Sequence, residues 1–211
     1  MTHAFMAGLK TGKPQGILSN RALVSLCALN FFMADVQAGI GPFLGVFLQR
    51  HGWQTGPIGS VMTAGGIVGM LATIPAGALL DQTTKKRLFV IIAALCTISA
   101  SLLLLSSQST LVVTISQLAT ALAGAGIGPL MAGMTLGIVR QKGFNAQIGR
   151  NQAWNHAGNM VGAGLSGWLG WTFGLTAIFF LEVTFGLLAI AAVLLIPEKS
   201  IDHQAARGLE E

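Results

Sequence analysis

The stretch "ALNFFMADVQAGIGPFLGVFL", residues 28–48, carries a single ionisable side chain, Asp35, in a background of apolar and small residues. At about 1.5 Å per residue, a helix of this length covers about 30 Å, the thickness of a membrane's hydrocarbon core. Lipid offers no hydrogen-bond partners to the backbone, so a crossing segment must be a helix or a strand of a closed barrel. The alternation typical of barrel strands is absent. Residues 28–48 therefore predict a transmembrane helix with an acid near its middle.

The same apolar character extends over most of the chain. Of its 211 residues, 53% are hydrophobic and only 9% are charged, and the mean hydropathy is +0.70. In an ordinary soluble domain about 25% of residues are charged. Apolar runs long enough to cross a membrane occupy residues 22–48, 56–80, 88–105, 111–139, 148–171 and 173–196. We therefore predict an all-α membrane protein with six transmembrane helices in residues 22–196, flanked by tails at 1–21 and 197–211.

The basic residues indicate the orientation of the predicted helices. Of the 12 Lys and Arg residues, all but Arg50 lie in four segments: before the first run, between the second and third runs, between the fourth and fifth runs, and after the sixth run. These residues are Lys10, Lys13, Arg21, Lys85, Lys86, Arg87, Arg140, Lys142, Arg150, Lys199 and Arg207. Short loops rich in Lys and Arg stay in the cytoplasm. Both tails are therefore predicted to be cytoplasmic. Because these residues are spread over four loops, the net charge of +5 does not indicate a nucleic-acid partner.

The segment "GALLDQTTKKRL", residues 77–88, joins the second and third predicted helices on the cytoplasmic side. Its characteristic residues are a glycine, an acid four residues later and a basic run, namely Gly77, Asp81, Lys85, Lys86 and Arg87. In spacing and position the segment resembles the signature loop of the major facilitator superfamily, Gly-x-x-x-Asp-x-x-Gly-Arg-Arg or Lys. Thr84 stands where the family usually has its second glycine. The resemblance implies that these five residues form a cytoplasmic gate that Asp81 organises. We expect the glycine to permit close helix packing and the cations to lie at the membrane surface.

This resemblance implies both a fold and a function. Members of the family usually have twelve helices in two six-helix bundles, each a 3+3 inverted repeat, with substrate held between the bundles. The six runs correspond to one half, and residues 197–211 look like the start of the family's central linker. The expected function is that of a half-unit of a secondary active transporter, which moves a small solute by alternating access as a symporter or antiporter. Its expected partners are the lipid bilayer, the solute and a second six-helix bundle.

The resemblance leaves open how that second bundle is supplied. The chain is a fragment, one product of a split gene, or a half-sized unit that dimerises. The expected location is a bacterial inner membrane. A competing hypothesis is a non-transporting six-helix scaffold or assembly partner.

Polar residues inside the predicted helices are the candidates for a solute path. On the first helix, Asn30, Ala34, Gln37, Gly41 and Gly45 fall within about 80° of one another at 100° per residue. Helices 1 and 4 line the central cavity in the resembled family, and helices 2 and 5 border it. The predicted solute and ion pathway consists of Asn30, Asp35, Gln37, Gln117, Asn151, Asn155, His156 and Asn159. In the alternative interpretation, these amides only form hydrogen bonds between neighbouring helices.

Asp35 poses the sharpest question in the sequence. An acid near the bilayer centre costs about 2.5–3.5 kcal/mol on insertion scales, so it is a functional candidate by default. Its direction differs from that of Gln37 by about 160° on an undistorted helix, although Gly39, Gly41 and Pro42 allow a bend just beyond it. We predict a proton-coupling or cation-contacting role for Asp35. The alternative is a neutral acid that ties the first helix to its neighbours.

Neither a metal site nor an enzyme is predicted. Cys27 and Cys96 lie inside apolar runs, and no second His or Cys stands at ligand spacing from His156. Residues 164–167 match the Gly-x-Ser-Gly of six-helix rhomboid proteases, but His156 lies about 15 Å from Ser166 along a helix. No cofactor motif occurs. We expect a hydrogen bond between His156 and Glu182, which have similar predicted depths.

Overall fold

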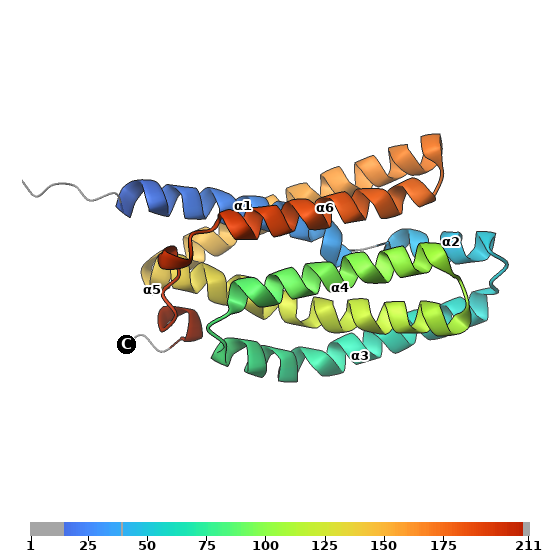
Figure 1. Ribbon diagram of the computed structural model, residues 1–211, viewed down its shortest axis with the longest axis horizontal. Helices are drawn as coiled ribbons and strands as arrows, with labels where there is room; N and C mark the ends of the chain where they lie inside the picture. The colour runs from blue at the N-terminus through green and yellow to red at the C-terminus, as the bar shows by residue number, and fades with distance from the viewer. Residues whose placement is uncertain (1–14, 39, 209–211) are drawn as a thin grey trace, which may run out of the picture.

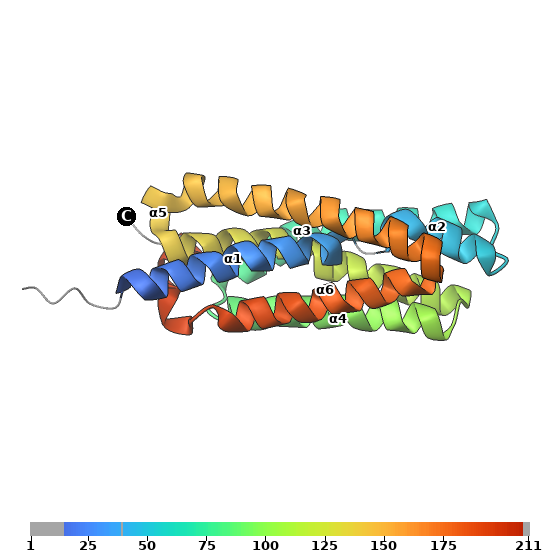
Figure 2. The same cartoon turned by 90° about the horizontal axis from the view of Figure 1, so that it is seen from above.

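The computed structural model describes residues 15–38 and 40–208, and this part of the chain forms a bundle of helices. The elements are α1 (Gln15–Ala38), α2 (Gly41–Arg50), α3 (Thr55–Gln82), α4 (Lys86–Ser106), α5 (Thr110–Phe173), α6 (Thr176–Leu195) and the short 3-10 helices η1 (Glu198–Ser200) and η2 (Ala205–Arg207). The helices α1 to α6 lie along one common axis (Figures 1 and 2). Within the described residues, five segments are long and apolar enough to cross a membrane. The prediction of an all-α membrane protein is therefore confirmed.

Helix α5 contains two of the six apolar runs. It spans 64 residues, or roughly 95 Å at about 1.5 Å per residue, far more than a bilayer core. The chain reverses at Arg140, whose φ of 54° and ψ of −178° are not helical. We call residues 110–139 the first limb and residues 141–173 the second limb; they run in opposite directions (Figure 1). The sequence predicted a loop between residues 139 and 148. This prediction is wrong, because the helix resumes directly after Arg140.

The first apolar run is also interrupted. Helix α1 ends at Ala38 and α2 begins at Gly41, with Pro42 in its first turn. Proline is accepted there because the first amide groups of a helix have no intrahelical partner. The helix is thus interrupted just beyond Asp35, where the sequence allowed a bend, and Gly39 itself lies outside the described residues.

The interior has two apolar clusters that follow this interruption. The first joins α1 to α4, the first limb and α6, and includes Leu26, Leu29, Met33, Val90, Ala94, Ile127, Leu130, Met134, Phe185, Ala189 and Val193. The second surrounds α2 and includes Ile40, Leu44, Phe47, Leu48, Ile58, Leu104, Val113, Ile178 and Phe179. The α1 and α2 parts of one apolar run therefore belong to different clusters.

Two glycines let α1 approach the second limb closely. A Cβ atom at Gly158 would collide with the carbonyl oxygen of Phe31 and would lie 2.9 Å from Cβ of Ala34. One turn later, a Cβ atom at Gly162 would collide with the carboxyl group of Asp35. Small residues at such positions are how membrane helices gain packing energy, because lipid is as apolar as the side chains.

A second close contact joins α3 to the first limb. A Cβ atom at Gly65 would lie 3.6 Å from the carbonyl oxygen of Gln117, and one at Gly69 would lie 3.6 Å from Cβ of Ala121. Both distances are ordinary van der Waals contacts. The two helices are therefore packed backbone to backbone at this level of the bundle.

One end of the bundle gathers three features that are distant in sequence. The turn 83–85 between α3 and α4, the reversal of α5 at Arg140, and the segment 197–208 all lie at the left end in Figure 1. We call this the basic end. Apart from Arg50, the described Lys and Arg residues of the loops lie in these segments, beside them or at the start of α1. We call residues 197–208 the tail segment.

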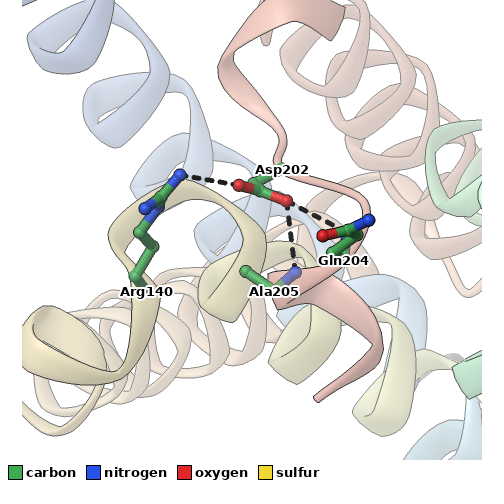
Figure 3. Close-up of polar contacts among 4 residues, drawn as sticks. All are labelled: Arg140, Asp202, Gln204 and Ala205. Carbon is green, nitrogen blue, oxygen red and sulfur yellow. Dashed lines mark hydrogen bonds and ion pairs between the residues drawn. The ribbon is translucent and has the colours of Figure 1, made fainter. Parts of the chain in front are cut away.

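The tail segment is held against the reversal of α5 by polar contacts (Figure 3). The backbone N–H of Asp202 donates to the carbonyl oxygen of Gly137 at 2.8 Å, and Nη2 of Arg140 donates to Oδ2 of Asp202 at 2.7 Å. Oδ1 of Asp202 accepts from the backbone N–H groups of Gln204 at 3.0 Å and Ala205 at 3.2 Å. These contacts lower the pKa of the Asp202 carboxyl group. The largest contribution comes from the N–H of Ala205, followed by the N–H of Gln204 and the guanidinium of Arg140.

The contact at Gly158 predicts a specific loss of stability. Gly158→Ala should destabilise the bundle by about 1–3 kcal/mol, the usual cost of overpacking, because α1 must move away from the second limb. Thermal unfolding of the purified protein in detergent measures the effect. Gly164→Ala is the matched control: it lies on the same limb, gains the same helix propensity and meets nothing within 4 Å. Equal unfolding temperatures for the two variants would contradict the proposed packing.

The ion pair of the tail segment predicts a pH dependence. Because the folded-state pKa of Asp202 is lowered, its carboxylate stabilises docking at pH values above the unfolded-state pKa. That stabilisation is lost as the pH falls through the folded-state value. The protection factors of residues 198–208, which compare the measured hydrogen exchange with the intrinsic rate at the same pH, should therefore be high at neutral pH and fall in acid. Asp202→Asn should have low protection factors at both pH values, and a tail that stays protected in this variant would refute the assignment.

Candidate functional site

An opening among polar residues lies between α3 and the first limb of α5. It has a volume of about 490 Å³, and Gln37 reaches it from the end of α1. Its polar members are Gln37, Thr73, Gln117 and Thr120, and glycines at positions 65, 66, 69 and 124 keep it open. We call this opening the α3–α5 groove.

Helical spacing explains why these residues share the groove. Gly66, Gly69 and Thr73 lie three and four residues apart on α3, so they occupy one face of that helix. Gln117 and Thr120 have the same relation on the first limb. Gln37 and Gln117 were predicted from the sequence, whereas the two threonines were not. The spacing from Gly69 to Thr73 and from Gln117 to Thr120 was the signal that could have found them.

Asp35 lies on the other side of α1 from the groove. Gln37 is exposed and lines the groove, whereas Asp35 is only 8% exposed and packs against Gly162 of the second limb. The opposed directions expected for these two side chains are thus confirmed, because helix α1 stays regular through both positions. Within the part of the chain that the structure describes, no group donates a hydrogen bond to Asp35. The acid is enclosed in an apolar interface without a counter-charge in contact.

Of three predicted pathway amides, Asn30, Asn155 and Asn159, only Asn155 forms a side-chain hydrogen bond between α1 and the second limb. Nδ2 of Asn30 donates to the carbonyl oxygen of Leu26 at 2.8 Å, within its own helix. Nδ2 of Asn155 donates to the carbonyl oxygen of Asn30 at 3.4 Å, and Nδ2 of Asn159 donates to the carbonyl oxygen of Asn155 at 3.2 Å. The bond from Asn155 to Asn30 fits the alternative interpretation of the amides as links between helices, whereas the other two bonds lie within one helix. None of the three lines the α3–α5 groove.

Asn151 links the two limbs of α5. Its Nδ2 donates to Oγ1 of Thr135 on the first limb at 2.9 Å, and its Oδ1 accepts from Nε2 of Gln147 at 2.9 Å. All three residues are buried. The sequence analysis did not select Thr135 or Gln147. Their bonds hold the limbs together near the reversal, and any role of Asn151 in a solute path stays a prediction.

His156 and Glu182 do not meet. His156 is exposed, while Glu182 of α6 is buried and accepts a hydrogen bond from Oγ of Ser101 on α4 at 2.6 Å. The expected bond between them is therefore wrong, because equal depth in the bundle does not place two side chains on the same side of it. Within the described residues, no group of three His, Cys, Asp or Glu side chains is arranged to hold a metal ion.

The signature-loop residues differ in exposure. Gly77 lies at the contact of α3 with the first limb, where a Cβ atom would be 3.6 Å from Cγ of Pro129. Asp81 and Lys85 are exposed. This part of the loop therefore matches the expected glycine packing and the expected surface charges.

The other two cations of the loop are partly withdrawn from solvent. Lys86 is only 2% exposed, and its Nζ donates to the carbonyl oxygens of Leu80 at 2.9 Å and Asp81 at 3.4 Å, at the end of α3. Nη2 of Arg87 donates to the carbonyl oxygen of Leu194 at 3.2 Å. The expectation that all three cations lie at the surface is wrong for Lys86, which satisfies carbonyl groups at the end of a helix.

Comparison with known proteins identifies relatives. The family model described as Major Facilitator Superfamily matches residues 26–211. Two uncharacterized MFS-type transporters of Mycobacterium tuberculosis, from strains CDC 1551 / Oshkosh and ATCC 25618 / H37Rv, are each 38% identical over 191 residues. The match covers 90% of this chain and 46% of each relative, so the chain spans about half the length of these relatives. No solved structure matches the chain.

The groove makes a prediction about solvent access. In a variant without Cys27 and Cys96, a cysteine at Gln117 should react with a membrane-impermeant maleimide, because position 117 lines the α3–α5 groove. A cysteine at Ser116, which is 1% exposed on the same limb, should not react. Mass spectrometry of the labelled protein in membranes measures both. Equal protection of the two positions would show that the groove does not hold water.

Proposed function

Because the chain belongs to the major facilitator superfamily, we propose that it forms half of a secondary active transporter. In this proposal it moves a small solute across the membrane by alternating access. The observation that supports this most directly is the α3–α5 groove, a polar opening in an otherwise apolar bundle. We assign one side of the solute path to this groove, with Gln37 and Gln117 as the residues nearest to the solute.

A second bundle is needed to complete the path. Only 11% of the most apolar window of α3 is buried within the chain. Met62, Ile67 and Met70 of this helix are exposed, and the groove beside them is open. A second six-helix bundle, from the same or another chain, would cover this face and enclose the groove, in keeping with the greater length of the relatives.

The groove chemistry favours a solute that forms hydrogen bonds. Its polar side chains are two amides and two hydroxyls, and no Lys, Arg, Asp or Glu is among the described residues that line it. Amides and hydroxyls both donate and accept, so they suit hydroxyl, amide or carbonyl groups of a solute. This half of the path thus selects by hydrogen bonding, while any ion pairing with a solute would come from the other half.

Asp35 is the proposed proton carrier. A carboxylate without a donor in a low-dielectric interface is costly, whereas a neutral carboxyl group is tolerated there. Motion of α1 relative to the second limb would change the exposure of Asp35 at Gly162 and the position of Gln37 in the groove together, because both belong to the regular part of α1. This shared helix is the proposed link between proton release and solute movement.

Transport assays test the proposed function. Vesicles that contain the protein should take up at least one member of a labelled panel of small polar solutes. Imposing a proton gradient should change the level of accumulation, and its direction distinguishes symport from antiport. If no panel member moves under any gradient, while cross-linking finds the chain bound to another membrane protein, the scaffold hypothesis replaces the transporter.

Substitution of Asp35 tests the coupling. Asp35→Asn should abolish gradient-driven accumulation but spare exchange of labelled for unlabelled solute, because exchange does not require net release of the proton. Accumulation and exchange are measured in the same vesicles at matched expression. Glu198→Gln is the control, since it neutralises an acid of the tail segment whose side chain is 77% exposed. Full accumulation by Asp35→Asn would leave this acid a structural role only.

A further inference from the structure

The register of α3 against the first limb fixes the height of each residue that lines the α3–α5 groove. The two helices run in the same direction along the bundle (Figure 1). Three neighbouring pairs keep the same offset between them, namely Gly65 with Gln117, Gly69 with Ala121, and Gly77 with Pro129. Each residue of the groove on α3 can therefore be placed beside a residue at the same height on the first limb.

This register spreads the polar side chains of the groove along the bundle axis. Gln117 stands at the height of Gly65, and Thr73 stands further along α3. Residues 65–73 of a helix cover about 12 Å at about 1.5 Å per residue. Thr120 follows Gln117 within one turn and so falls between these heights. Gln117 and Thr73 therefore mark two polar ends of the groove.

The polar groups at these heights are available to a ligand. Within the part of the chain that the structure describes, the side chains of Gln37, Gln117 and Thr120 form no hydrogen bond. Oγ1 of Thr73 donates to the carbonyl oxygen of Gly69 at 2.8 Å, which leaves this oxygen able to accept. No Lys, Arg, Asp or Glu is among the described residues that line the groove. The groove therefore offers neutral donors and acceptors along its length, which suit an uncharged solute.

Two glycines of the groove have no packing role in the bundle. A Cβ atom at Gly65 or Gly69 would lie 3.6 Å from the first limb, so contact between the helices accounts for both. A Cβ atom at Gly66 or Gly124 would meet nothing within 4 Å, although both residues line the groove. Glycine weakens a helix relative to alanine, so a glycine without a close neighbour needs another reason. Bare backbone at these two positions leaves room for a bound solute.

Each bare position lies beside one polar end of the groove. Gly66 is at the height of Gln117, and the same register puts Gly124 within one residue of the height of Thr73. Across the groove, α3 and the first limb are packed backbone to backbone at Gly65, so a solute cannot pass between them. The available room therefore extends along the bundle axis.

We propose that the α3–α5 groove binds an elongated, uncharged solute that lies along the bundle axis, with hydrogen bonds to Gln117 at one end and to Thr73 at the other. The solute lies against the bare backbone at Gly66 and Gly124, so these two glycines set how wide it can be. This inference rests on the proposed function, which assigns the groove to the solute path, and it adds the length, the charge and the direction of the solute.

Protection of single cysteines tests the length of the site. In the full chain in detergent, without Cys27 and Cys96, Met62→Cys and Ala125→Cys place a thiol toward either end of the groove and leave its polar side chains intact. The probes are uncharged N-acetyl glycine-oligomer amides of increasing length, which extend by about 3.3–3.6 Å per residue. We expect oligomers of about four residues to slow maleimide labelling of both thiols. Their half-protecting concentration should be about fivefold lower than that of the single-residue probe, the usual effect of one further hydrogen bond.

Variants of the two bare positions distinguish a solute site from a disturbed helix. Gly66→Val and Gly124→Val should each weaken protection by the longer probes about fivefold or more, the usual effect of overpacking. Gly59→Val on α3 and Gly164→Val on the second limb are the controls, because a Cβ atom at either position also meets nothing within 4 Å and neither residue lines the groove. Both controls should leave protection unchanged.

The inference is overturned if no probe protects either thiol, if protection does not depend on probe length, or if the controls weaken protection as much as the groove variants. Uptake of solutes by vesicles without this length dependence would keep the proposed transporter and remove the inference. Length-dependent protection without any uptake would keep the site and count against the proposed transporter.

Discussion

The close approach of α1 to the second limb of α5 is the constraint on which the bundle and its candidate site both depend. Apolar contraction cannot drive helices together in lipid, so contact must come from backbones that fit closely. Gly158 admits the carbonyl oxygen of Phe31, and Gly162 admits the carboxyl group of Asp35. The same approach brings Asn155 within hydrogen-bond distance of Asn30. A wider separation would lose the packing, the interhelical bond and the shelter of the acid together.

Periodicity predicted a large part of this fold. The apolar run at 22–48 and the opposed directions of Asp35 and Gln37 follow from helix geometry, and Pro42 allowed a bend beyond Asp35 without requiring one. The reversal of α5 did not follow. The nearby glycine, Gly143, is the residue that turn propensity would choose, yet the chain reverses at Arg140 with a positive φ. Tertiary packing of the two limbs overrides local preference there, and nothing in the local sequence announces it.

The candidate site was predicted less completely than the fold. A helical wheel gives the direction of a side chain on its own helix, but it does not identify the helix that stands opposite. For that reason the bond between Asn151 and Thr135, sixteen positions apart, was not anticipated, and Glu182 was paired with His156 when Ser101 is its partner. Gln117 does line the groove, and its role in a solute path stays a prediction.

The docking of the tail segment changes where a connection to any second bundle begins. With Asp202 bonded to Gly137 and Arg140, the backbone is fixed beyond the end of α6, and Ile201 and Ala206 pack against Gly137. Any connection to a second bundle therefore leaves the docked segment at about Gly208, not at Ile196. The effective concentration of a tethered partner falls as a flexible linker lengthens past the span it must bridge. Fixing this stretch would keep two halves of a transporter at a higher mutual concentration than the distance along the sequence suggests.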